Sequence, residues 1–213
     1  MTVQRQKSAK EFGFWLVTKA YVVVFPFLLI VGSGCLYALT SNRPEAKIAG
    51  LPLFTLMVWT TILAPVALFM YGTFSRRRLL KSIVTSLRNP DVFCPSPTFE
   101  VYHEGEGKYL GIDVEHGTIL YVHKIRKGAV DVVALTMDDW TNREVDENTL
   151  RLYTKRPQLP RIEISTPWAQ RWFDVLGAME HQRPTPRRPF PSHVGNALEG
   201  LERQHHIQIP RFA

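Results

Sequence analysis

The stretch YLGIDVEHGTILYV (residues 109–122) contains two runs of apolar residues on either side of Glu115, His116 and Gly117. In each run apolar residues alternate with other residues, which is the period of a β-strand. Two such runs joined by a short segment that contains glycine predict a β-hairpin. The hairpin therefore places the centre of the chain in a sheet.

The same pattern recurs before and after this hairpin. Turn-forming pairs such as Lys127-Gly128 and Glu147-Asn148 separate the runs. Short strands at this spacing predict an antiparallel sheet system. The seven predicted strands are residues 98–103, 108–114, 118–124, 130–136, 140–145, 149–154 and 161–165.

After the seventh strand the period changes in STPWAQRWFDVLGAMEHQ (residues 165–182). Trp168, Trp172, Leu176 and Met179 recur every three or four residues, with Thr166 as N-cap and Pro167 at the first helical position. This spacing predicts one amphipathic helix that buries its tryptophans against the sheet. Seven strands and a closing helix resemble the pleckstrin-homology-like superfold over residues 97–182.

Two long apolar stretches precede this domain. Residues 20–39 (AYVVVFPFLLIVGSGCLYAL) and 51–71 (LPLFTLMVWTTILAPVALFMY) hold 20 and 21 residues without a charge. At about 1.5 Å per residue, each can cross a hydrocarbon core of about 30 Å. We predict two transmembrane helices, at about residues 14–39 and 51–72, within a membrane hairpin of residues 1–74. The predicted fold class is α+β.

A cleaved leader is the alternative for the first stretch, because GSGC places Cys35 in a sequence similar to a lipoprotein cleavage box. Gly32 stands where such boxes have an aliphatic residue, and a second spanning stretch follows at once. Both observations favour a membrane span.

Basic residues flank the two spans unequally. The first span has four basic residues before it or at its start: Arg5, Lys7, Lys10 and Lys19. The loop between the spans carries two, Arg43 and Lys47. The segment after the second span carries five: Arg76, Arg77, Arg78, Lys81 and Arg88. This bias predicts that both termini lie in the cytoplasm.

The segment SRRRLLKSIVTSLR (residues 75–88) has five basic residues and no acidic one, and its apolar residues have helical spacing. Two compatible interpretations follow. The basic residues Arg76, Arg77, Arg78, Lys81 and Arg88 contact anionic lipid at the membrane surface. Alternatively, the helix only sets topology and packs its apolar stripe on the folded domain. Asn89-Pro90 and the prolines at 95 and 97 end this helix, so residues 75–96 form a juxtamembrane helix and linker.

Charge is divided by region in a way that argues against nucleic-acid binding. Residues 97–182 have 10 Lys and Arg against 14 Asp and Glu, a net charge of −4, whereas residues 1–96 and 183–213 have net charges of +8 and +3. A nucleic-acid-binding domain needs a basic face, which this folded region lacks.

No catalytic constellation is present. EGEGK (residues 104–108) precedes a strand and not a helix, so it predicts a hairpin turn, not a phosphate loop. Asp138-Asp139 fits a turn better than an acid/base pair. The histidines and cysteines lack the spacing of a metal site. They are His103, His116, His123, the adjacent pair His205-His206, Cys35 and Cys94. We predict neither an enzyme nor a small-molecule substrate, cofactor or metal.

The last segment, residues 183–213, begins with RPTPRRPFPSH and is basic and proline-rich. Such composition predicts a solvated linker or a docking segment. Within it, residues 194–203 are compatible with a short helix, and IQIPRF (residues 207–212) with addition to a sheet edge.

Two membrane spans, a basic helix and the runs YLGIDVEHGTILYV, VVALTMDDWTNREV and LRLYTKRPQLPRIEI resemble the surface or entry exclusion proteins of IncI-type conjugative plasmids, over most of residues 10–182. The resemblance implies a protein of the bacterial inner membrane that stops a second donor from delivering a related plasmid. It implies as partner, besides the lipid bilayer, an integral membrane protein of the donor's transfer apparatus, a type IV secretion system. The alternative is a membrane-anchored module that senses lipid or regulates a transporter or envelope enzyme.

The predicted orientation can be tested with reporter fusions. We expect alkaline phosphatase fused after Arg88 to be inactive and a fluorescent protein fused there to fluoresce, because both would lie in the cytoplasm. The opposite pair of results would overturn the orientation.

Overall fold

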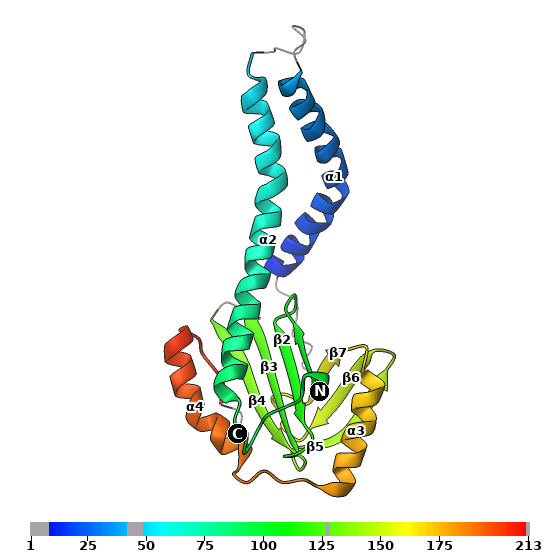
Figure 1. Cartoon of the computed structure of the whole chain (residues 1–213), viewed down its shortest axis with the longest axis vertical. Helices are drawn as coiled ribbons and strands as arrows, with labels where there is room; N and C mark the ends of the chain where they lie inside the picture. The colour runs from blue at the N-terminus through cyan, green and yellow to red at the C-terminus, as the bar shows by residue number, and fades with distance from the viewer. Residues whose placement is uncertain (1–8, 42–48, 127, 212–213) are drawn as a thin grey trace. The chain divides into compact units, whose positions relative to one another are not determined.

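The computed structural model describes residues 9–41, 49–126 and 128–211. The chain forms two compact units, Met1–Tyr71 and Gly72–Ala213. Helices and two antiparallel sheets give the predicted α+β class (Figure 1). Four of the basic residues used to predict orientation, Arg5, Lys7, Arg43 and Lys47, lie outside the described residues, as does Lys127 of a predicted turn.

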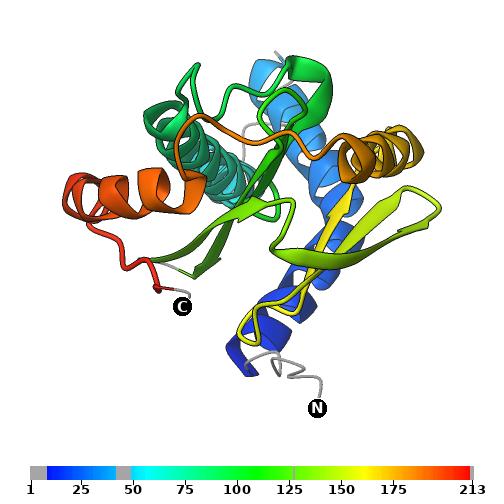
Figure 2. The same cartoon turned by 90° about the horizontal axis from the view of Figure 1, so that it is seen from below.

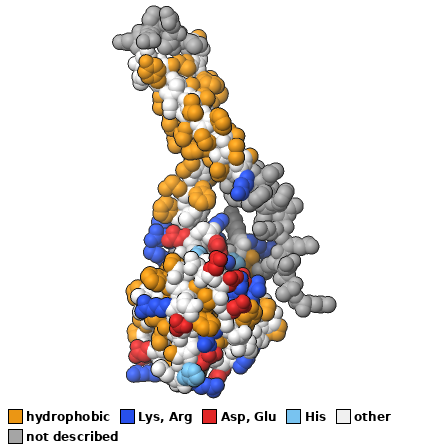
Figure 3. Space-filling view, turned by 90° about the vertical axis from the view of Figure 1, so that its right-hand side faces the viewer, with side chains coloured by type: hydrophobic (Ala, Val, Ile, Leu, Met, Phe, Trp, Pro, Cys, Tyr) orange, Lys and Arg blue, Asp and Glu red, His pale blue; other side chains and the backbone are white. Residues whose placement is uncertain are grey.

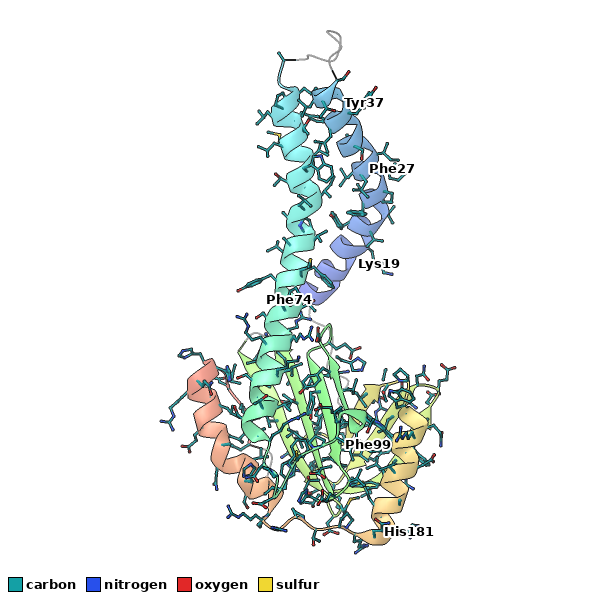
Figure 4. The ribbon with its side chains drawn as sticks, in the orientation of Figure 1. Lys19, Phe27, Tyr37, Phe74, Phe99 and His181 are labelled. Carbon is teal, nitrogen blue, oxygen red and sulfur yellow. The ribbon has the colours of Figure 1, made fainter. Side chains whose placement is uncertain are left out.

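The first unit contains α1 (Ala9–Thr40) and the first part of α2 (Leu51–Leu87). Both helices are long and apolar enough to cross a membrane. Hydrophobic side chains cover much of their surface (Figure 3), and Phe27 projects from α1 on the side away from α2 (Figure 4). The polar atoms Tyr21 Oη and Trp59 Nε1 donate hydrogen bonds to the carbonyls of Ile62 and Gly32, at 2.7 and 3.3 Å. The helix pair thus satisfies these donors internally, as a lipid environment requires.

The second unit is built around a four-stranded antiparallel sheet in the order β1-β2-β3-β4. Its strands are β1 (Glu100–His103), β2 (Lys108–Asp113), β3 (Thr118–Arg126) and β4 (Ala129–Thr136). Side chains on both faces of β2, β3 and β4 are buried in two separate apolar clusters. Burial on both faces explains why these strands contain nearly continuous apolar runs such as VVAL.

A second sheet of three strands, β5 (Trp140–Asp146), β6 (Thr149–Thr154) and β7 (Arg161–Ser165), covers one face of the first. Its inner side chains, among them Leu152 and Ile164, are buried, whereas its outer face is polar. Arg151 on that face pairs with Asp146 at 2.8 Å and with Glu163 at 3.1 Å. All seven predicted strands are therefore present.

The predicted closing helix is α3 (Ala169–Gln182), which buries Trp172, Leu176 and Met179 between itself and the two sheets. Two details of that prediction were wrong. The N-cap residue is Trp168 and not Thr166. The Trp168 side chain is 58% exposed, so it does not belong to the buried stripe. Because the helix starts two residues later than predicted, Trp168 lies outside its regular turns.

The prediction of a solvated linker for the last segment was also wrong. The segment forms α4 (Phe190–His205), which is longer than the short helix considered for residues 194–203. Phe190, Val194, Leu198 and Leu201 are buried on the outer face of the four-stranded sheet. Gln208 then forms a parallel bridge with Ala129, so this segment does reach a sheet edge. Figure 2 shows α3 and α4 on opposite sides of the two sheets.

The end of α2 completes that outer layer. Leu80, Ile83, Val84 and Leu87 are fully buried together with α4 residues and the first sheet. The interpretation in which the apolar stripe of residues 75–88 packs on the folded domain is confirmed.

Packing of α3 gives a stability prediction. Trp172 is fully buried and its Nε1 donates to the Thr98 carbonyl at 3.0 Å, so Trp172→Ala should lower the free energy of unfolding by about 3–5 kcal/mol. Gln170→Ala, on the exposed face of the same helix, should cost less than about 0.5 kcal/mol. Urea unfolding of the full chain in detergent, followed by circular dichroism, measures both. Equal small effects would contradict burial of the tryptophan.

Candidate functional site

Of the five residues predicted to contact the membrane surface, four lie on α2 and the fifth directly follows it, so they form two groups. Arg76, Arg77, Arg78 and Lys81 lie near its entry into the second unit, and Arg88 follows its last residue. At about 1.5 Å per residue, Arg88 lies about 18 Å farther along the helix axis than Arg76. The two groups therefore have different surroundings.

The first group meets the loop between β1 and β2. Arg77 Nε forms an ion pair with Glu104 Oε1 at 2.8 Å, and Arg76 Nη1 donates a hydrogen bond to the Gly105 carbonyl. The tip of this hairpin lies next to α2 in the ribbon (Figure 1). Arg76 and Gly105 are 29 residues apart in the sequence, and packing brings them together.

The end of β3 joins the same group through Gly107. The Lys124 amide donates to the Gly107 carbonyl at 2.8 Å. Gly107 has a φ of 70°, and a Cβ at this position would lie 3.1 Å from Lys124 Cβ. Glycine therefore permits both the turn and the close approach of β3. The EGEGK segment is a hairpin turn, as predicted.

We call this group the juxtamembrane cluster; its charged members are Arg76, Arg77, Arg78, Lys81, Glu104, Glu106, Lys108 and Lys124. Burial, with a further contribution from the nearby Arg76 charge, lowers the pKa of Lys124. The hydrogen bond from Lys108 lowers the pKa of Glu106. Arg78 and Lys81 are exposed, and no described residue forms an ion pair with either. Six basic against two acidic side chains leave the cluster positive.

Arg88 has a different role, because it binds Glu100 of β1 through an ion pair. Tyr109 Oη donates to the same carboxylate oxygen at 3.1 Å, and Tyr102 packs on the Tyr109 ring. The hydrogen bond to Glu100 raises the pKa of Arg88, and burial raises the pKa of Tyr109. Arg88 thus fastens the end of α2 to the first sheet.

Three of the histidines considered as catalytic or metal-binding residues have separate structural partners. His103 Nε2 donates to the Ser165 carbonyl, and His205 Nε2 lies 3.1 Å from Ser82 Oγ. His116 lies 2.9 Å from the buried Asp113 carboxylate, which also accepts the Cys94 amide. His116 therefore stabilises the turn of the central hairpin, and only a small part of its side chain is exposed.

Asp138 and Asp139 occupy a turn, as predicted. Asp139 Oδ2 accepts hydrogen bonds from the backbone amide and the hydroxyl of Thr136, both at 2.7 Å. Within the described part of the chain, no three His, Cys, Asp or Glu side chains form a group that could hold a metal ion.

The sequence was compared with known proteins. The sequence model of one family, described as exclusion-determining protein, matches residues 1–213, the whole chain. The chain belongs to the exclusion-determining protein family. No curated protein and no solved structure matches it. Membership supports a function in plasmid exclusion, in agreement with the resemblance found in the sequence.

Sequence reasoning found the four basic residues that α2 gives to the juxtamembrane cluster, but not Lys108, Lys124 or the acidic partner Glu104. The ion pair depends on the β1–β2 turn lying beside α2, which no local pattern encodes. One signal was available, because EGEG places two carboxylates and two flexible residues at a hairpin tip. Such a tip can approach a basic helix closely.

Proposed function

We propose that the chain is an entry exclusion protein of the recipient's inner membrane, which blocks redundant conjugative transfer by recognising a membrane protein of the donor's transfer apparatus. The observation that carries this proposal is the match of the exclusion-determining family to the whole chain. Two helices of membrane-spanning length and the basic segment after them support the membrane location. The positive-inside bias supports cytoplasmic termini.

Binding, and not chemistry, is the proposed mode of action. His116 and Asp139 hold turns and His103 holds a strand end, so structural roles account for these three side chains. A pleckstrin-homology-like scaffold with exposed loops would suit recognition of another protein. The proposed recognition loops are residues 104–108 and 124–128; the structure describes both except for Lys127.

The juxtamembrane cluster supports a second, compatible contact with anionic lipid. Arg76 follows the first unit's last residue, Tyr71, by five positions, a rise of about 7.5 Å along a helix. Exposed basic residues this close to a span are attracted to anionic headgroups by about 1 kcal/mol each. Arg78 and Lys81 are the best placed for this contact, because Arg76 and Arg77 also bind the β1–β2 loop. Lipid sensing by a regulatory module is the alternative function that this cluster favours.

A mating assay tests exclusion directly. The chain expressed alone in a recipient should reduce uptake of a plasmid with the cognate transfer system by orders of magnitude, and leave transfer of an unrelated plasmid unchanged. We expect this selectivity because the protein would recognise one transfer apparatus and would need no other protein encoded by its plasmid. Transconjugant counts, normalised to the amount of membrane-inserted protein, provide the measurement.

Exchange of the loops at 104–108 or 124–128 for those of a relative should change which plasmid is refused. As the control, Asp138→Asn at an exposed turn position should leave exclusion near normal. Exclusion by binding involves no covalent bond that this carboxylate would have to make or break. If the inserted wild-type protein reduces uptake from no related donor, exclusion is the wrong function and the regulatory alternative gains support.

A further inference from the structure

β4 is the last strand of the four-stranded sheet, so only one of its two edges pairs with a neighbouring strand. On the other edge, the Val130 amide points outward and donates to the Gln208 carbonyl at 3.1 Å. Residues two apart in a strand direct their amides and carbonyls to the same side. The backbone groups of Val132 and Ala134 therefore point to this edge as well, where the two residues are 4% and 5% exposed.

The two ends of the edge already have partners that are not strands of the sheet. At one end Gln208 also donates its amide to the Gly128 carbonyl at 2.8 Å, as the first residue of an added strand would. At the other end Arg156 Nη2 donates to the Ala134 carbonyl at 3.0 Å. Between these ends, no hydrogen bond from a described residue reaches the outward amide and carbonyl of Val132.

A hollow of about 140 Å³ lies along this middle part, between β4, α4 and the segment after α4. Figure 2 shows α4 and that segment on this side of the sheet. Its apolar lining includes Val132, Ala134, Val194 and Leu198. The α4 wall is open at Gly195, where an added Cβ would have no atom within 4 Å.

Two arginines complete the hollow. Arg156 lies beside β4, and its other neighbour is Asp139 at 4.0 Å. Arg211 follows α4 and pairs with Glu202 at 2.9 Å. The site thus combines unused strand hydrogen-bonding groups, an apolar lining and two positive charges.

We propose that this β4 edge groove docks an extended segment of the recognised partner protein, and that the segment carries an acidic side chain. The inference rests on the proposed function, which supplies the partner. The segment's backbone would bond to Val132 and add a strand to the sheet, a common mode of peptide recognition. A helix would not use these groups, because its own amides and carbonyls are already bonded to each other.

Arg156 gives the groove its charge preference. An added strand would supply an amide to the Ala134 carbonyl and so replace the Arg156 hydrogen bond. The released guanidinium would then be free to form a charge-assisted bond with a carboxylate of the segment. The Ala134 carbonyl would then accept from the added strand and the Arg156 guanidinium would donate to the carboxylate, so neither group would be left without a hydrogen bond.

Two glycines of α4 allow a matched test. Gly195 lines the groove and Gly200 does not, yet an added Cβ has open space at both positions and both lie inside the same helix. Gly195→Trp should fill the groove and reduce exclusion in the mating assay by about tenfold or more, as loss of a central contact does. Gly200→Trp should exclude like wild type. Thermal unfolding and membrane abundance of the full-length variants establish that both fold.

The outcomes separate the two proposals. If wild type, Gly195→Trp and Gly200→Trp all exclude equally, the groove is not the docking site, although exclusion stands. If wild type itself does not exclude, the proposed function fails. A photo-cross-linking residue at Gly195 should also capture a peptide with Asp or Glu from isotopically labelled donor cells, and the same residue at Gly200 should not. Capture of only unlabelled recipient peptides at Gly195 would overturn the assignment of the segment to the donor.

Discussion

Burial of both faces of the four-stranded sheet is the constraint on which the second unit depends. One face is covered by the second sheet and α3, and the other by α4 and the end of α2. Leu80, Ile83, Val84 and Leu87 of α2 are fully buried there, and burial of each such side chain contributes about 1.5–3 kcal/mol. The helix that continues from the apolar first unit is therefore part of the core of the second. Changes in the end of that helix can therefore affect the packing of the folded domain.

Sequence alone predicted the elements whose periodicity is local. The seven strands and α3 each carry their own repeat of apolar residues, and the two apolar helices contain long stretches without a charge. Only residues 194–203 of α4 were considered as a helix, because the prolines before them were interpreted as a linker, although proline is well tolerated in the first helical turn. The sequence nevertheless contains the spacing of a buried helical face, at Phe190, Val194, Leu198 and Leu201. This spacing could have predicted the whole helix.

The candidate site was less predictable, because its contacts join segments distant in sequence. Basic residues of α2 were found from charge, but the Arg77–Glu104 pair depends on the hairpin and the helix lying together. Arg88 was grouped with them by composition, whereas the structure gives it Glu100 as a partner. The open edge of β4 could not be predicted, because sheet order follows from strand pairing and not from any single strand.

Cytoplasmic termini would constrain recognition, because the second unit could then meet only a partner segment that reaches the recipient's cytoplasm. Under the proposed function, recognition resides in this unit. Two family members that refuse different plasmids allow the direct measurement, which exchanges residues 72–213 between them at the boundary of the two units. In mating assays with both donors, we expect the refused plasmid to follow residues 72–213. Specificity that follows residues 1–71 would contradict it.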